Sequence, residues 1–176
     1  VLVKHSNENV AGAAAQALGR FAGEMASLTL RDAYARDARF HVRIHALGGL
    51  ARMRDPATAS LALAALNDEN IVIQGGGLGA LEGLGDSAYS VAMLEYMDRQ
   101  SPGEADGDLL EVVGKLGDPP GSTAVRDRLV AEANKKTNPF EVRYGAARGL
   151  KTMGLATLVK PVFDVAYARN TNDTLM

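Results

Sequence analysis

Two histidines, His41 and His45, are spaced four residues apart. This spacing lets two imidazoles on one face of a helix bind the same zinc ion. A helical zinc site also needs a further ligand, and no Glu or Asp follows the pair at a suitable distance. Arg43 lies between the two histidines, and His5 stands alone. We therefore interpret the pair as part of an amphipathic helical surface and expect neither a metal nor another cofactor.

The remaining residues do not have the pattern of a catalytic centre either. The chain contains no cysteine, which excludes thiolate catalysis and cysteine-bound zinc. Its three histidines occur in two regions and leave little room for a Ser, His and Asp triad. Residues 75–85 include six glycines but form neither of the glycine-rich motifs that bind phosphate. We expect these glycines to let neighbouring helices pack closely, in a helix softer than the others because glycine disfavours helix.

The charge is distributed unevenly along the chain. Residues 67–118 carry a net charge of −9, between +3 for residues 1–66 and +4 for residues 119–176. An acidic surface of this kind is suited to docking a cationic protein. The favoured interpretation is nevertheless a solvated loop and outer face, because charge runs usually serve solubility and residues 100–108 have the composition of a flexible connection. The predicted partner contacts are Glu95, Tyr96, Asp98, Glu104, Asp106 and Asp108.

A group of basic residues in the last third of the chain raises the question of nucleic-acid binding. Such sites need aromatic side chains for stacking, yet the chain has no tryptophan, its net charge is −2, and acidic residues interrupt the group. We expect no nucleic-acid partner. The chain shows no signal peptide and no apolar run long enough to cross a bilayer, so we expect a cytoplasmic location without membrane contact. The basic residues are Arg126, Arg128, Lys135, Lys136, Arg143, Arg148 and Lys151.

The elements that carry these residues follow from an internal repeat with a period of roughly 30 to 40 residues. In each repeat an apolar residue is followed by another apolar or small residue at +8 and by a third at +11. These offsets correspond to two and three helical turns, so each triplet lies on one face of a helix. The triplets are Val10/Leu18/Phe21, Val42/Leu50/Met53, Ile73/Leu81/Leu84, Ala105/Val113/Leu116 and Val142/Leu150/Met153.

A second helix follows each of these first helices. Asp55, Asp86 and Asp118 come two residues after the last apolar position of their triplets, where a carboxylate can cap the next helix. Further apolar stripes follow, at Ala59/Leu63/Leu66, Val91/Leu94/Met97, Val125/Leu129 and Leu158/Val162/Ala166. First helices are predicted at 7–22, 39–53, 70–84, 106–117 and 139–153. Second helices are predicted at 24–36, 56–67, 87–99, 120–134 and 155–169.

A single two-helix unit cannot cover its own apolar face, so successive units must stack on one another. The sequence therefore predicts an all-α fold, an α-solenoid of about five HEAT-like two-helix repeats in one domain spanning 1–176. The predicted repeats are 5–37, 38–68, 69–100, 105–135 and 138–170.

Several stretches resemble the C-terminal HEAT-like region of bacterial zinc aminopeptidases of the aminopeptidase N type. They are FHVRIHALGGL at 40–50, GLGALEGLGD at 77–86, MLEYM at 93–97, and the residues 125–150 that include NPFEVRYGAARGL. The resemblance implies a helical domain that covers or supports a separate active site. The His-Glu-x-x-His helix and the Gly-x-Met-Glu-Asn loop of that family are not in this chain, so no catalytic residue is transferred.

These observations favour a non-catalytic module that holds a rigid surface, formed mainly by second helices, against another domain or protein. A covering domain of a zinc aminopeptidase is the leading specific hypothesis. A free-standing adaptor or assembly scaffold is the alternative, and a lyase-like or glycosylase-like enzyme is the third. Neither end of the sequence has the polar cap typical of a terminal repeat, so we expect further repeats in a longer protein, or self-association through an end.

Overall fold

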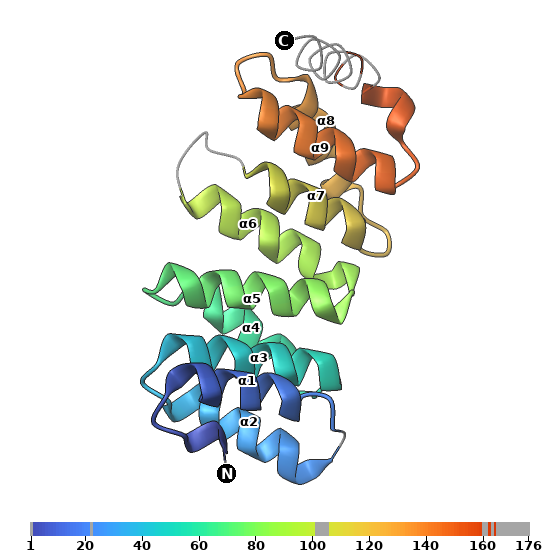
Figure 1. The fold of residues 1–176 in the computed structure, drawn as a ribbon. Coiled ribbons are helices and arrows are strands. Elements are labelled where there is room, and N and C mark those ends of the chain that lie inside the picture. The colour runs from blue at the N-terminus through green and yellow to red at the C-terminus, as the bar shows by residue number, and fades with distance from the viewer. Residues whose placement is uncertain (1, 22, 101–105, 160–161, 163, 165–176) are drawn as a thin grey trace. The chain divides into compact units, whose positions relative to one another are not determined.

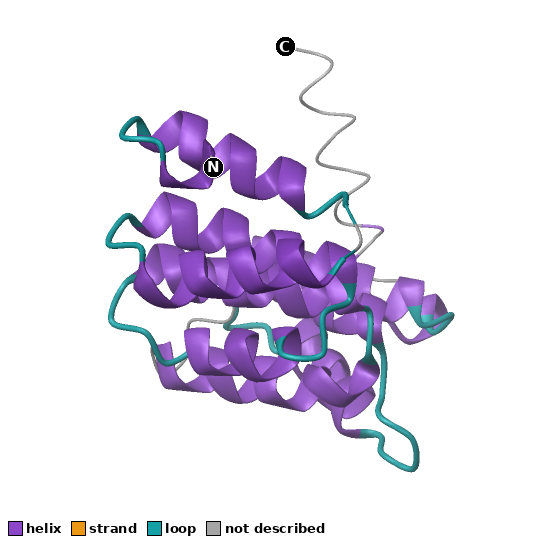
Figure 2. Cartoon of the chain, turned by 90° about the horizontal axis from the view of Figure 1, so that it is seen from below, coloured by secondary structure: helices purple, strands orange, loops and turns teal. Residues whose placement is uncertain are grey.

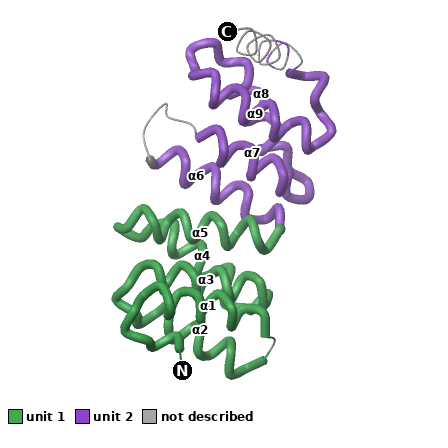
Figure 3. Tube along the Cα trace, viewed as in Figure 1, with its two compact units in different colours: residues 1–85 green, residues 86–176 purple. Residues whose placement is uncertain are grey.

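The computed structural model describes residues 2–21, 23–100, 106–159, 162 and 164 (Figure 1). Across these residues the regular elements are helices joined by loops, with no strand (Figure 2). The predicted all-α class and α-solenoid architecture are therefore confirmed. The chain divides into two compact units, Val1–Gly85 and Asp86–Met176, which are coloured separately in Figure 3.

Unit 1 is built from hairpins whose first helices form one layer. Helix α3 packs against α1 on one side and α5 on the other, while α2 packs on α3 and α4 packs on α5. A short 3₁₀ turn, η1, lies against α1. The elements are η1 (Leu2–Lys4), α1 (Glu8–Leu18), α2 (Glu24–Arg36), α3 (Phe40–Met53), α4 (Thr58–Ala65) and α5 (Ile71–Leu84).

In the described residues of unit 2, first helices again pack side by side and second helices pack on them. The first helices α7 and α9 share the most extensive contact of the unit, and α8 packs on α9. Helix α6 contacts both α7 and α8. The elements are η2 (Ser87–Tyr89), α6 (Ser90–Gln100), α7 (Gly107–Leu116), α8 (Ala124–Asn134), α9 (Phe140–Thr152) and η3 (Ala156–Val159).

The apolar positions predicted for the later first helices form the cores of the two units. In α3 and α5, the first two members of each triplet are fully or almost fully buried. The third members, at +11, are half-buried, so they lie at the edge of the same face. The buried members in the described residues are Val42, Leu50, Ile73, Leu81, Val113, Val142 and Leu150.

The prediction for the first triplet was wrong. Val10 is 38% exposed and Phe21 is 65% exposed, whereas Ala11, Gly12 and Ala15 form the buried face of α1. The reason is the contact with α3, which approaches α1 so closely that only small residues fit between them. The apolar residues of this helix therefore turn away from α3.

The stripes predicted on the second helices need two further corrections. In α4, Thr58, Ala62 and Ala65 are buried, while the predicted Ala59 and Leu63 are only half-buried. Near the end of the described chain, Leu158 is exposed although it was predicted to face the core. Val91 is half-buried, and Ala166 lies outside the described residues. Several apolar or small residues occur at adjacent positions in these segments, so spacing alone does not select the buried one.

The starts of three predicted helices coincide with side chains that cap them, although α2 matches its predicted bounds without a side-chain cap and α1 ends at Leu18, before the predicted 22. Asn7, Asn70 and Asp106 each accept hydrogen bonds from backbone N–H groups in the first turn of α1, α5 and α7. The predicted helix at 120–134 starts later, at Ala124, because Pro119-Pro120-Gly121 form a turn before it. The Oδ1 of Asp118 spans this turn and accepts a hydrogen bond from the amide of Val125 at 2.9 Å. The predicted helix at 87–99 divides into η2 and α6. Most of the predicted helix at 155–169 lies outside the described residues.

A matching arginine near the start of α3 and of α9 ties each hairpin to the preceding one. The Nε of Arg43 donates to the carbonyl of Tyr34 at the end of α2, and the Nε of Arg143 donates to that of Ala133 at the end of α8, both at 3.1 Å. These carbonyls lack partners within their own helices. The Arg43 guanidinium also lies 5.3 Å from the centre of the Tyr34 ring and pairs with Asp68 at 3.1 Å.

Glycines allow the first helices to touch backbone to backbone. A Cβ on Gly19 would lie 2.8 Å from the carbonyl oxygen of Gly49, and one on Gly114 would lie 2.6 Å from the carbonyl carbon of Gly149. The α1–α3 and α7–α9 pairs are therefore packed in the same way. The expectation for the glycine-rich helix α5 was only partly right. Gly76 and Gly77 meet neighbours within 3 Å, whereas a Cβ at Gly75 or Gly79 would meet nothing within 4 Å.

Candidate functional site

The histidine pair on α3 has a packing role. The ring of His41 lies 4.1 Å from the ring of Phe40, and the ring of His45 covers Gly12 of α1 so closely that a Cβ there would be 2.7 Å from it. In the part of the chain that the structure describes, no three His, Asp or Glu side chains gather in a way that could hold a metal ion. His45 is thus part of a contact between hairpins, whereas His41 contacts its neighbour Phe40 in the same helix.

The residues predicted to contact a partner differ in how exposed they are and in which residues they bind. Asp98, at the end of α6, accepts from Arg128 at 2.6 and 3.1 Å, and these hydrogen bonds hold the pKa of its carboxyl below the usual value. Tyr96 is only 6% exposed, and this burial raises the pKa of its phenol. Glu95 is exposed on α6. Glu104 lies outside the described residues.

Asp106 and Asp108 lie at a pocket of about 360 Å³ between α7 and α9. The pocket exists because Gly107 and Gly145 bring the two helices together, so that side chains from both surround one opening. Asp106 caps α7 through its Oδ1, which accepts from the amide of Asp108 at 2.9 Å. The other side chains that matter here are Glu111 of α7 and Phe140, Glu141, Tyr144 and Arg148 of α9.

The aromatic residues form one wall of this α7–α9 pocket. The rings of Phe140 and Tyr144 are stacked, with centres 5.5 Å apart and planes 13° from parallel. The guanidinium of Arg148 lies 6.0 Å from the centre of the Tyr144 ring and pairs with Glu111 at 2.9 Å. The pocket therefore already places one guanidinium between an aromatic face and a carboxylate, which is a favourable environment for a cation.

The charge of the α7–α9 pocket is strongly negative. Four of its lining residues are acidic, and Arg148 is the one basic residue among them. Glu111 is shared between Arg148 and Lys115, the latter at 3.4 Å. The exposed carboxylates of Asp108 and Glu141 form no ion pair with any described residue. They are available to a cation from outside.

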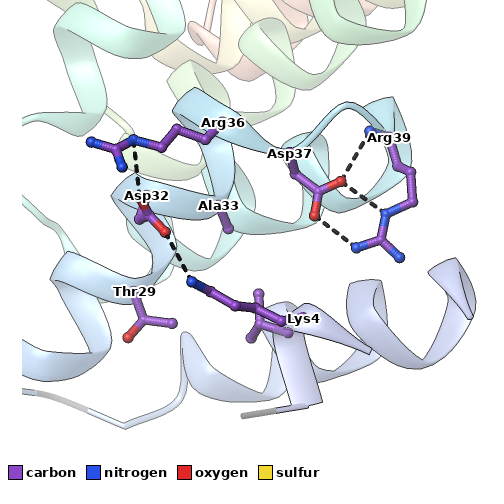
Figure 4. Close-up of a pocket in the computed structure, with 8 residues that line it drawn as sticks. Lys4, Thr29, Asp32, Ala33, Arg36, Asp37 and Arg39 are labelled. Atoms are coloured by element: carbon purple, nitrogen blue, oxygen red, sulfur yellow. Dashed lines mark hydrogen bonds and ion pairs between the residues drawn. The ribbon is translucent and has the colours of Figure 1, made fainter. Parts of the chain in front are cut away.

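A second pocket, of about 370 Å³, lies between η1 and α2 in unit 1 (Figure 4). Its charged groups satisfy one another. Asp32 pairs with Arg36 at 3.2 Å and with Lys4 at 3.7 Å, and Asp37 accepts from Arg39 at 2.7 and 2.8 Å. The Arg39 hydrogen bonds lower the pKa of the Asp37 carboxyl. A charged ligand would have to displace these pairs, so we regard this pocket as the weaker candidate.

The basic residues of the last third of the chain are mostly held by internal partners. Arg128 pairs with Asp98 and Glu132, Arg143 binds a backbone carbonyl, and Arg148 pairs with Glu111. Arg126 pairs with its neighbour Asp127. Of the seven, three have no ion pair or side-chain hydrogen bond with the described residues: Lys135, Lys136 and Lys151. The group therefore does not form a single basic surface.

Two residues of α9 that complete the α7–α9 pocket, Phe140 and Glu141, were missed in the sequence, whereas Arg148 was considered only as one of the basic residues. Glu141 and Phe140 lie more than 30 residues from Asp108, and charge runs along the chain do not connect them. The available signal was the repeat itself. Because first helices of neighbouring repeats pack side by side, the starts of the fourth and fifth first helices should face one another. Their charges could have been considered together on that basis.

These features define a helical-repeat protein made of two-helix hairpins, with an acidic and aromatic pocket between α7 and α9. The family model for HEAT repeats matches residues 1–82, which cover unit 1 except for its last three residues. Searches of curated proteins and of solved structures returned no match. None of the described helices is both long enough and apolar enough to span a membrane.

Proposed function

We propose that this chain is a non-catalytic interaction module and that its α7–α9 pocket binds a lysine or arginine side chain of a partner. The partner is another protein or another domain of the same protein, and the location is cytoplasmic. The observation that carries the proposal is the pairing of two free carboxylates, Asp108 and Glu141, with a stacked aromatic wall. An arginine on such a surface gains from charge and from ring stacking together.

The proposal is tested with a peptide of alternating arginine and glycine. Its affinity for the chain should fall about tenfold when Asp108→Asn and Glu141→Gln are combined, because two exposed charge pairs together contribute about 1.4 kcal/mol. Binding should also weaken as salt is added. Isothermal titration calorimetry measures both effects.

The matched control removes two exposed acidic charges from unit 1, with Glu8→Gln and Glu69→Gln. This variant has the same net charge as the pocket variant, so it should keep most of the wild-type affinity. Equal weakening in both variants would show that only the overall charge matters. Unchanged affinity in the pocket variant would overturn the proposed site.

The narrower proposal is that the module covers the catalytic domain of a zinc aminopeptidase. It rests on the resemblance of residues 40–50, 77–86, 93–97 and 125–150 to that class of enzyme. A His-Glu-x-x-His segment in the same reading frame, upstream of Val1, would support it. A free-standing adaptor remains the alternative, and a reading frame without such a segment would favour it.

A second candidate interaction, self-association, is favoured by exposed apolar residues of unit 1. Phe21, Met25 and Leu28 are 65%, 77% and 50% exposed, at the start of α2 and just before it. They are flanked by Arg20 and Glu24, both exposed and without an ion pair among the described residues. A two-fold axis that passes between Arg20 and Glu24 would bring the arginine of one copy toward the glutamate of the other, as an isologous dimer requires.

Self-association is tested by light scattering at increasing protein concentration. We expect the mass of the wild-type chain to rise toward that of a dimer, and the variant Met25→Glu with Leu28→Glu to remain a monomer. Ile71→Glu is the control, because Ile71 is equally exposed but lies on α5. A wild-type chain that stays monomeric at high concentration would rule this interface out.

A further inference from the structure

Helices α3 and α5 have the same length, 14 residues, but very different glycine content. Two of the residues of α3 are glycines, whereas α5 contains five, at positions 75, 76, 77, 79 and 83. Each glycine in a helix costs about 1 kcal/mol relative to alanine, since it loses more conformational freedom on folding. Helix α5 therefore has a much weaker intrinsic tendency to be helical than its neighbour.

Packing explains only two of these five glycines. A Cβ at Gly77 would lie 2.8 Å from the carbonyl oxygen of Ala62, and one at Gly76 would lie 2.8 Å from the side chain of Ile44. At Gly75 and Gly79, no atom lies within 4 Å of the Cβ position, and at Gly83 the nearest is at an ordinary 3.7 Å. Alanine would fit at these last three positions. Their glycines weaken the helix without improving its packing.

The ends of α5 are well formed, so the weakness lies in its interior. Asn70 caps the first turn by accepting from the amide of Val72 at 2.9 Å. Gly85 ends the helix in the left-handed conformation, with a φ of 69°. The main contacts of α5 among the described residues are with α3 and α4, and its buried residues include Ile73, Ala80 and Leu81. It is also the last helix of unit 1.

From these observations we infer that α5 opens locally while α1 to α4 remain folded. Unit 1 then has two states, a closed one and one in which α5 has left the face of α3 and α4. The glycines at positions 75 and 79 set the balance between them, since each shifts the opening equilibrium by about fivefold relative to alanine. A partner that binds either state can shift this equilibrium, because local opening is part of the native ensemble.

Hydrogen–deuterium exchange of the full chain, followed by mass spectrometry, tests the inference. In the wild type, amides of α5 should exchange faster than those of α3. Combining Gly75→Ala with Gly79→Ala should slow exchange in α5 about 25-fold, the product of the two single effects, and leave α3 unchanged. Gly77→Ala should do the opposite and speed exchange in α5, because the new methyl group pushes the helix away from α4.

The matched control is Gly48→Ala in α3, where a Cβ also meets nothing within 4 Å. It should leave the exchange of α5 as it is. A common exchange rate for α3 and α5 in the wild type would overturn the inference, because it would mean that unit 1 opens only as a whole. An alanine pair that leaves α5 unchanged, or slows α3 equally, would also overturn it.

Discussion

Replacing Gly145 by alanine is expected to lower the free energy of unfolding by about 3 kcal/mol, at the upper end of what overpacking usually costs. The new Cβ would lie 2.5 Å from the Cα and from the carbonyl carbon of Gly107. The clash is with backbone, so no side chain can move aside. Helices α7 and α9 must separate, and the apolar contacts around Leu110 and Ala146, both fully buried, are weakened. Denaturant unfolding followed by circular dichroism measures the loss.

The control for this prediction is an alanine at a helical glycine with open surroundings. Gly48→Ala introduces the same methyl group into α3, where nothing lies within 4 Å. It should raise the free energy of unfolding by roughly 0.5 to 1 kcal/mol through helix propensity alone. Similar effects for the two substitutions would mean that the close approach of α7 and α9 does not exist in solution.

The second large effect is expected at Asp55, which joins the first two hairpins. Its side chain is 4% exposed and accepts hydrogen bonds from Arg31 at 2.6 and 3.0 Å and from the amide of Ala57 at 2.9 Å. The hydroxyl of Ser27 also donates to it. Asp55→Ala leaves these donors without an acceptor, so we expect a loss of roughly 2 to 4 kcal/mol in the free energy of unfolding.

The effect of Asp55→Ala should depend on pH in a defined direction. Burial raises the pKa of the Asp55 carboxyl, but the hydrogen bonds from Ser27, Ala57 and Arg31 outweigh burial and leave the pKa below its ordinary value. A carboxyl with a lowered pKa in the folded state stabilises the protein fully above its unfolded pKa of about 3.9. This stabilisation disappears as the pH falls through the lower, folded value. The difference between wild type and variant should therefore be constant near neutral pH and shrink below about pH 4.

Asp32→Asn is the control for Asp55. Asp32 is also paired with basic residues, but its side chain is 40% exposed and those of Lys4 and Arg36 are more exposed still. An exposed ion pair contributes at most about 1 kcal/mol, so this variant should unfold at nearly the wild-type denaturant concentration. If the two variants were equally stable at neutral pH, the buried network at Asp55 would not be a principal link between the hairpins.

Much of the fold was predictable because the signals are local. Helix α3 begins and ends within a residue of its prediction, and Val42 and Leu50, the positions that the spacing selected, are fully buried. Helix α1 has the same periodicity, but its face is chosen by how closely α3 approaches, which is a tertiary property. Small residues therefore displaced Val10 from the core, and a spacing rule could not anticipate this.

The candidate site was only half predictable for a related reason. Asp106 and Asp108 were identified from the charge of their own segment. The residues that make a pocket of it, Glu141, Tyr144 and Phe140, belong to the next repeat and reach it through the contact of α7 with α9. That contact depends on glycines whose role the sequence does not reveal.

Glycine illustrates the same limit within a single helix. Gly76 and Gly77 are required by close neighbours, whereas Gly75 and Gly79 are not, although all four occur in one short run. The run predicted a soft and closely packed helix, and the structure assigns the two properties to different residues. Whether a glycine of α5 is required depends on how closely α3 and α4 approach it, which the sequence of α5 does not show.

The central claim is that the α7–α9 pocket binds a basic side chain of a partner. Its most direct test is a titration of the ¹⁵N-labelled chain with the arginine–glycine peptide, followed by amide chemical shifts. The account predicts that the largest changes map to the starts of α7 and α9, around Asp108 and Tyr144, and that the Asp108→Asn, Glu141→Gln variant needs about ten times more peptide to reach the same changes. Changes spread evenly over the acidic residues of both units, or centred on another surface, would contradict it.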